Sequence, residues 1–114
     1  MNDFYCSEVL SKKTKVDIVF ESEEVLAFHH TQPYFELHIV VIPKKHIESL
    51  SSLETHPVIA GELMKAITYV SKLVESKFGG CRVSSNVGSY QTTKHLHWYV
   101  HYGRRLRNED GSIV

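Results

Sequence analysis

Apolar side chains recur along the chain with two different periods, and each period predicts its own kind of secondary structure. Over residues 16–20 apolar and polar positions alternate, as they do in a strand with one buried face. The later candidate strands are short apolar or alternating runs bounded by turn-forming residues such as Pro33 and Gly88. The five strands predicted in this way span residues 16–20, 25–28, 38–43, 81–86 and 94–102.

A longer period marks one helix between residues 55 and 78. Its apolar positions recur every three or four residues and form a single stripe: Ile59, Leu63, Ile67, Val70, Val74 and Phe78. We expect Thr55 to cap this helix, Pro57 to occupy its first turn, and Gly79 with Gly80 to end it. A short helical turn is predicted at 7–12.

These elements predict an α+β fold, a mainly antiparallel five-stranded sheet with one short and one long α-helix. The sheet is expected to be antiparallel because most connections are too short for parallel crossovers. A length of 114 residues, 42% of them hydrophobic and 23% charged, suits a single globular domain over residues 1–114. A polar tail is expected at about 104–114. Solvation is the default for its Arg-rich run 104–107, and contact with a partner or entry into the substrate pocket are the alternatives.

Charge and composition narrow the classes of partner. Thirteen Lys and Arg balance thirteen Asp and Glu, so we expect neither a nucleic-acid partner nor binding to a membrane surface. The longest aliphatic run, 39–42, is far short of the roughly 20 residues that span a bilayer. The charged N-terminal segment resembles no signal peptide, and the two cysteines form no C-x-x-C pair, so a reduced, cytoplasmic protein is expected.

The chain contains eight histidines, and most of them fall in two groups. His29, His30, His38 and His46 form the first group, and His95, His97 and His101 the second. Clustered imidazoles suit proton transfer, nucleophilic attack or metal binding, because their pKa lies near neutrality. The alternative, a set of histidines without a joint role, is equally compatible with composition alone.

The last predicted strand gives this cluster a geometry. Alternation along a strand places His95, His97, Tyr99 and His101 on one face, and Leu96, Trp98, Val100 and Tyr102 on the other. The second row is expected to face the core and the first to be exposed. The alternative interpretation is that these aromatic and histidine side chains form a surface row without a functional role.

Two segments resemble the histidine-triad (HIT) superfamily of nucleotide hydrolases and transferases, and specifically its nucleoside-phosphoramidase branch. Segment 91–100 reads QTTKHLHWYV, similar to the family pattern Gln-Ser/Thr-x-x-His-x-His-x-His. Segment 38–46 reads HIVVIPKKH and resembles the strand end that precedes it in the family. Leu26-Ala27-Phe28 and Asn86-Val87-Gly88 also match the family in order, so the resemblance covers most of the chain.

The resemblance implies a HIT-like fold, usually paired as a homodimer, and a mechanism. His97 would attack the α-phosphate of a nucleotide and form a transient nucleotidyl-imidazole, which water or another acceptor resolves. His95 would position His97 and set its tautomer, and His46 would contribute to the same pocket. The expected activity is that of a nucleotide phosphoramidase, hydrolase or nucleotidyl transferase without a cofactor, acting on a small nucleotide such as a purine nucleoside phosphate.

Further residues are assigned to substrate binding. Phosphate oxygens would be bound by Asn86, Gln91 and Thr92, whose alternative role is ordinary turn formation. The nucleoside pocket is expected to include Phe28, His30 and Ile42.

Two positions depart from the family pattern. Tyr99 stands where the third triad histidine belongs, and a phenol is a poorer proton donor than imidazolium at neutral pH. His30 replaces the acidic residue that usually holds the ribose hydroxyls. A nucleotide-binding or protein-interaction module that has lost catalysis is therefore the alternative function.

A third departure concerns metal binding. Cys6 matches only the second cysteine of the C-x-x-C that holds zinc in some bacterial relatives, and Asp3 stands in place of the first. These two residues with His46 would form a weakened site, but a lone thiol is more often simply buried. We therefore expect no metal.

Overall fold

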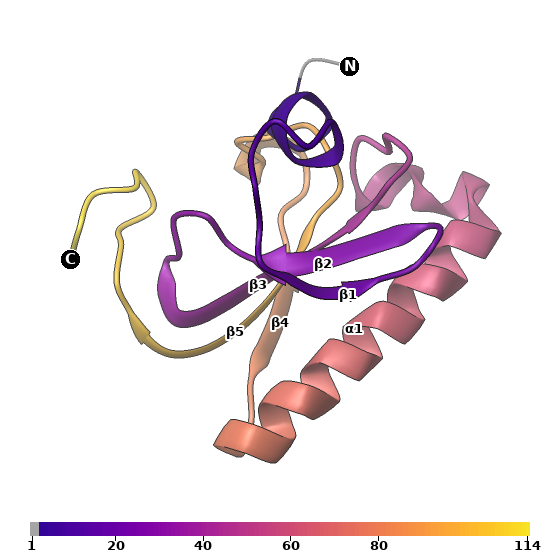
Figure 1. Cartoon of the computed structure of the whole chain (residues 1–114). Helices are drawn as coiled ribbons and strands as arrows, with labels where there is room; N and C mark the ends of the chain where they lie inside the picture. The colour runs from indigo at the N-terminus through magenta and orange to yellow at the C-terminus, as the bar shows by residue number, and fades with distance from the viewer. Residues whose placement is uncertain (1–2) are drawn as a thin grey trace.

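The structure, a computed structural model, describes residues 3–114 and forms one five-stranded sheet (Figure 1). The strand order is β1-β2-β3-β5-β4, and every neighbouring pair is antiparallel. The strands are β1 (Ile18–Glu21), β2 (Val25–His29), β3 (Phe35–Pro43), β4 (Arg82–Ser85) and β5 (Trp98–Arg105). The predicted α+β fold with a mainly antiparallel sheet is confirmed.

Helix α1 (Pro57–Phe78) lies along one face of the sheet (Figure 1). Side chains that alternate along the central strands form the core beneath it, including Ala27, Val41 and Val100. The buried stripe of α1 packs onto them through Ile59, Leu63, Ala66, Ile67, Val70 and Val74. The predicted helix is thus confirmed in its position and in most of its buried face, but Phe78, predicted to be in the stripe, is exposed.

The opposite face of the sheet is covered by the N-terminal segment. A π-helical turn, η1 (Tyr5–Leu10), places Tyr5 and Val9 against Leu26, Phe28, Val40 and Ile42. The expectation that His95, His97, Tyr99 and His101 form an exposed row is therefore wrong. Only 2% of His97 is exposed, because this second apolar layer closes over the site face.

Only the N-terminal end of α1 differs from the prediction. The N-cap residue is His56, whose side chain makes no capping bond. The Thr55 hydroxyl, predicted to cap the helix, instead donates to the Ser52 carbonyl in the preceding 3-10 turn, η2 (Leu50–Thr55). Gly79 adopts φ +94° and donates its N–H to the Glu75 carbonyl, so it ends the helix as predicted. The short predicted helix is displaced to Tyr5–Leu10 and is π-helical.

Strand boundaries shift most at β5. This strand begins at Trp98 rather than residue 94, since the segment before it is held outside the sheet ladder by the Leu96 N–H, which donates to Ile47. It continues to Arg105, and the tail then folds back through a bridge between Arg107 and Ile113. Within residues 3–114 no helix is long and apolar enough to cross a membrane.

Candidate functional site

His97 lies at the entrance to β5 with its tautomer fixed by the backbone. Its Nδ1 lies 2.7 Å from the His95 carbonyl oxygen, and only a protonated nitrogen makes that bond. The lone pair therefore resides on Nε2. Burial lowers the pKa of His97, which keeps the ring neutral and nucleophilic near pH 7. The rings of Tyr5 and Tyr99 cover it, with centroids 5.3 and 5.2 Å away.

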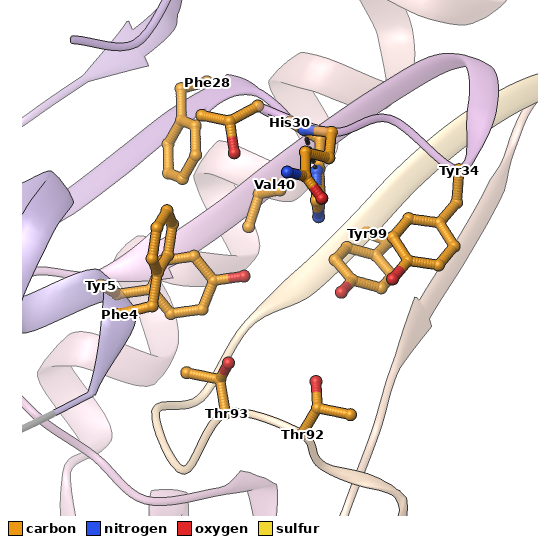
Figure 2. Close-up of a pocket in the computed structure, with 11 residues that line it drawn as sticks. Phe4, Tyr5, Phe28, His30, Tyr34, Val40, Thr92, Thr93 and Tyr99 are labelled. Atoms are coloured by element: carbon orange, nitrogen blue, oxygen red, sulfur yellow. Dashed lines mark hydrogen bonds between the residues drawn. The ribbon is translucent and has the colours of Figure 1, made fainter. Parts of the chain in front are cut away.

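A cavity of about 250 Å³ is lined by Tyr5 and Tyr99 and lies between η1, the end of β2 and the loop that precedes β5 (Figure 2). Its apolar wall comes from η1 and the central strands, and its polar wall from the loop residues Thr92 and Thr93. The labelled lining residues are Phe4, Tyr5, Phe28, His30, Tyr34, Val40, Thr92, Thr93 and Tyr99. An aromatic wall facing hydroxyl groups suits a nucleoside.

His30 lies in this cavity as a neutral ring. Burial, together with the neighbouring His97 and Arg107, lowers its pKa to about 4. Its Nδ1 accepts the Gln32 N–H at 3.0 Å, so its proton resides on Nε2. At pH 7 His30 therefore offers one neutral N–H donor, where a carboxylate would offer only acceptors.

His38 on β3 stacks on His30, with ring centroids 4.5 Å apart. Its Nδ1 accepts the Tyr34 N–H at 2.9 Å, which leaves the proton on Nε2. Within the described chain this buried Nε2 has no hydrogen-bond partner. Burial and the nearby His30 lower the pKa of His38 to about 3. His38 is thus a neutral donor without a protein acceptor.

A second cavity, of about 490 Å³, adjoins the first and shares Tyr34, Thr92 and Tyr99 with it. His38 and the predicted phosphate-binding residue Asn86 line it. Ring and charged side chains complete its wall: Phe35, Tyr90, His101, Arg105 and Glu109. His97 itself lines neither cavity in the described structure. Of the two tyrosines that contact its ring, Tyr5 lines the first cavity and Tyr99 lines both.

Both tyrosines that cover His97 are protonated near neutral pH. Burial, followed by the neighbouring Tyr99, raises the pKa of Tyr5 well above its ordinary value. Burial and Tyr34 likewise raise the pKa of Tyr99. Each hydroxyl can therefore donate a hydrogen bond, but Tyr99 is a weaker acid than an unperturbed phenol.

Four candidate metal ligands converge behind His97. Asp3, Cys6, His46 and His95 each present one ligand atom, and these atoms lie within 4.8 Å of one another. The Nδ1 of His95 lies 3.4 Å from both Cys6 Sγ and the Asp3 carboxylate, and Asp3 lies 2.8 Å from His46 Nδ1. Although burial alone raises the pKa of Asp3, the Cys6 N–H and the His95 ring hold it below its usual range.

The chemistry of this donor set fits zinc. The Nε2–H of His95 donates to the Pro43 carbonyl at 2.9 Å, so its Nδ1 lone pair points at the cluster, as in histidines that ligate metals. Two imidazoles, a thiol and a carboxylate are all zinc ligands. Of these four ligands, the sequence indicates only Asp3, Cys6 and His46, because the spacing of His95 places it in the catalytic row.

His95 contacts His97 through its backbone carbonyl rather than its ring, and His46 lies outside both cavities. The tautomer of His97 is set by the His95 carbonyl oxygen, whereas the His95 ring is turned toward Asp3 and Cys6. His46 approaches this same ring, with centroids 5.2 Å apart, and lines neither cavity.

The structure brings together some of the predicted binding residues and not others. Gln91 uses its amide inside the loop: Oε1 accepts the Gly88 N–H, and Nε2 donates to the carbonyls of Glu48 and Thr93. It shapes the loop that carries Asn86 and Thr92 and lines neither cavity.

Ile42 is fully buried beneath η1, and Val40, two residues earlier on the same face, lines the nucleoside-sized cavity instead. Sequence reasoning also missed Tyr5, because its position over His97 depends on how the N-terminal segment folds back. Arg105, which belongs to the basic run 104–107, lines the larger cavity.

Comparison with known proteins agrees with this geometry. Residues 11–105 match the family model described as the HIT domain. A 13.2 kDa HIT-like protein of Azospirillum brasilense is 39% identical over 93 residues, which cover 77% of this chain and 75% of that protein.

Two solved structures share the fold. A HIT family hydrolase from Clostridium thermocellum is 28% identical with a TM-score of 0.76, covering 90% of this chain and 91% of that one. A hypothetical histidine triad nucleotide-binding protein from Sulfolobus tokodaii is 28% identical with a TM-score of 0.77, covering 87% of this chain and 67% of that one.

Proposed function

Since the chain belongs to the HIT domain family, we propose that it is an enzyme of the nucleoside-phosphoramidase type. It would hydrolyse or transfer a nucleoside monophosphate group through a nucleotidyl intermediate on His97. The observation that carries the proposal is the fixed tautomer of His97, which leaves Nε2 as a nucleophile behind Tyr5 and Tyr99, two residues that line a nucleoside-sized cavity.

The two cavities suggest how a nucleotide would lie. The base and ribose fit the first cavity, between Phe28 and the N–H of His30. The α-phosphate would then lie near Thr92 and Tyr99, which both cavities share. The amide of Asn86, which lines the second cavity, would donate to the phosphate oxygens.

The reaction proceeds in two displacements. His97 Nε2 forms a bond to the α-phosphorus, and the bond to the leaving group breaks with its electron pair departing on that group. Water then attacks the phosphorus and loses a proton, while the phosphorus–nitrogen bond breaks and returns the lone pair to His97. Preorganised donors stabilise the charge on the phosphoryl oxygens in both steps.

Zinc would have a structural role here. When bound by Asp3, Cys6, His46 and His95, it would fasten η1 to the segment before β5. Fastening η1 keeps Tyr5 over His97, because Tyr5 lies between Asp3 and Cys6 in the sequence.

Homodimerisation is part of the proposal. β4 is an edge strand on which Val83 is exposed, and α1 exposes Met64 and Leu73. A second copy would cover such unpaired surfaces. Sedimentation velocity tests this: the parent should sediment as a dimer and Val83→Asp should shift it toward monomer, whereas a monomeric parent contradicts the proposal.

Intact-mass spectrometry tests the chemistry. The protein is mixed with adenosine 5′-phosphoramidate or diadenosine triphosphate and quenched with acid at short times. We expect release of AMP and an adenylyl adduct on the parent and on His29→Asn, an exposed control, but neither on His97→Ala. Absence of product and adduct in the parent, beside an active relative, would refute catalysis.

A binding module without turnover is the second candidate. The burial of His97 beneath Tyr5 and Tyr99 favours it, since the nucleophile lines neither cavity. In that case AMP should bind the parent and His97→Ala with equal affinity in calorimetry, and the parent should release no product.

A further inference from the structure

The proposed nucleophile lies on a segment that runs outside the sheet ladder, just before β5. This strand begins at Trp98, so residues 95–97 are not part of it, and yet His97 is only 2% exposed. Backbone groups buried outside a sheet still need hydrogen-bond partners, because an unpaired group costs stability. The partners that this segment finds therefore decide where the His97 ring lies.

On one side the segment is bound to the chain at and after the end of β3. The Leu96 N–H donates to the Ile47 carbonyl at 2.6 Å, and the His95 Nε2–H donates to the Pro43 carbonyl at 2.9 Å. The Leu96 side chain is fully buried in the core. These contacts fix the two residues before His97, but they do not pair the carbonyl of His97 itself.

On the other side β4 ends too early to pair that carbonyl through its backbone. Ser85 lies opposite Trp98, so a continued ladder would place Asn86 opposite His97. However, β4 ends at Ser85, and the backbone hydrogen bonds of the described chain include none from Asn86 to the His97 carbonyl. The Ser85 hydroxyl donates to this carbonyl instead, at 2.7 Å. A side chain thus makes the bond that the backbone makes elsewhere in the sheet.

Ser85 is not placed to contact a bound nucleotide. It is half-buried and lines neither cavity. Its effect on the site runs through His97, because the residue whose carbonyl it binds also has its Nδ1 2.7 Å from the His95 carbonyl. One bond holds the main chain of His97 and the other holds its ring. If the main chain is released, the ring bond loses its alignment.

Both the position and the tautomer of the ring matter for the chemistry. Displacement at phosphorus needs the attacking atom in line with the leaving group, and a misplacement of about 1 Å can cost about a hundredfold in rate. The tautomer of a neutral imidazole is set by the hydrogen bond that one ring nitrogen makes. A tether on the His97 main chain therefore serves both requirements.

We propose that Ser85 is a positioning residue for the nucleophile and acts through the main chain of His97. This rests on the proposed function. The Ser85 hydroxyl holds the His97 carbonyl, and the fixed main chain keeps the ring Nδ1–H bonded to the His95 carbonyl. Nε2 then keeps the lone pair that attacks the α-phosphorus.

Ser85→Thr and Ser85→Val form a matched pair for a kinetic test. Both introduce a β-branched side chain that suits a strand, but only threonine keeps the hydroxyl. The values of kcat and KM for adenosine 5′-phosphoramidate are compared in the two variants and the parent. We expect kcat of Ser85→Val to fall about tenfold or more below that of Ser85→Thr, with KM unchanged, because positioning is lost and binding is not. Equal kcat values in the two variants, or a change in KM alone, overturns the proposal.

NMR of the isotope-labelled protein tests the same point without turnover, because it distinguishes protonated from unprotonated ring nitrogens. We expect His97 to keep its proton on Nδ1 in the parent and in Ser85→Thr, and to share it with Nε2 in Ser85→Val. If Ser85→Val does not fold, Ser85→Ala takes its place as the variant without a hydroxyl. Val74→Ala, a core change near the C-terminal end of α1, should lower stability and keep the parent tautomer.

The two measurements separate this proposal from the proposed catalysis. A parent without turnover refutes catalysis, and a tautomer that still depends on the hydroxyl then supports the positioning role of Ser85. The parent tautomer in a folded variant without the hydroxyl overturns that role, and so does an equal shift in Val74→Ala, which would mark a general loss of stability.

Discussion

Acid should destabilise this protein through His38, a neutral ring held in a buried position. Its Nδ1 accepts the Tyr34 N–H, so protonation would replace an acceptor with a donor and break that bond. It would also place a charge beside the His30 ring, 4.5 Å away. The folded protein therefore resists protonation of His38, whereas the unfolded chain does not.

The magnitude follows from the two pKa values. The pKa of His38 falls from the ordinary value of 6.5 to about 3 on folding, so between these values only the unfolded chain binds the proton. The stabilisation by neutral His38 is fully present above pH 6.5 and is lost as the pH falls toward 3. At about 1.4 kcal/mol per pH unit, His38 alone lowers the free energy of unfolding by about 2.5 kcal/mol between pH 7 and pH 4.5.

Urea denaturation of the parent and of His38→Gln at these two pH values measures this effect. His38→Gln is expected to be less stable at pH 7 but to lose about 2.5 kcal/mol less on acidification. His29→Gln, at an exposed position, should lose as much as the parent. Equal acid losses in the parent and in His38→Gln would refute the reasoning. NMR titration of the His38 ring in the folded parent gives the same answer without a variant, since a midpoint near 6.5 contradicts it.

Other perturbations test separate parts of the structure. Leu63→Ala, beneath α1, should lower the free energy of unfolding by about 2 to 5 kcal/mol in urea denaturation, and a loss below 1 kcal/mol would contradict its core position. Gln91→Ala removes three loop hydrogen bonds and should raise KM for nucleotide severalfold while helical content stays unchanged by circular dichroism; an unaltered KM would contradict the shaping role. Tyr5→Ala should speed the modification of His97 by diethylpyrocarbonate, followed by peptide mass spectrometry, because Tyr5 covers that ring. Elemental analysis should find one zinc per parent chain and less in Asp3→Ala; equal content in the two would exclude Asp3 as a ligand.

Much of the fold was predictable because its signals are local. The period of the apolar positions predicted α1 and its buried stripe, and Gly79 ended the helix as expected. Element ends were less predictable, since they depend on competing hydrogen bonds. The Thr55 hydroxyl donates to the Ser52 carbonyl instead of capping α1, and the Leu96 N–H donates to the Ile47 carbonyl instead of extending the β5 ladder.

By itself the sequence indicated the family and made His97 the proposed nucleophile, because the spacing of His95, His97 and Tyr99 is a property of contiguous residues. It did not determine what surrounds them. Only the folded chain brings Tyr5 over His97, turns the His95 ring toward Asp3 and Cys6, and lines the second cavity with Arg105. The physical reason is that these contacts join residues from opposite ends of the chain, and their positions follow from packing on the sheet rather than from local preference.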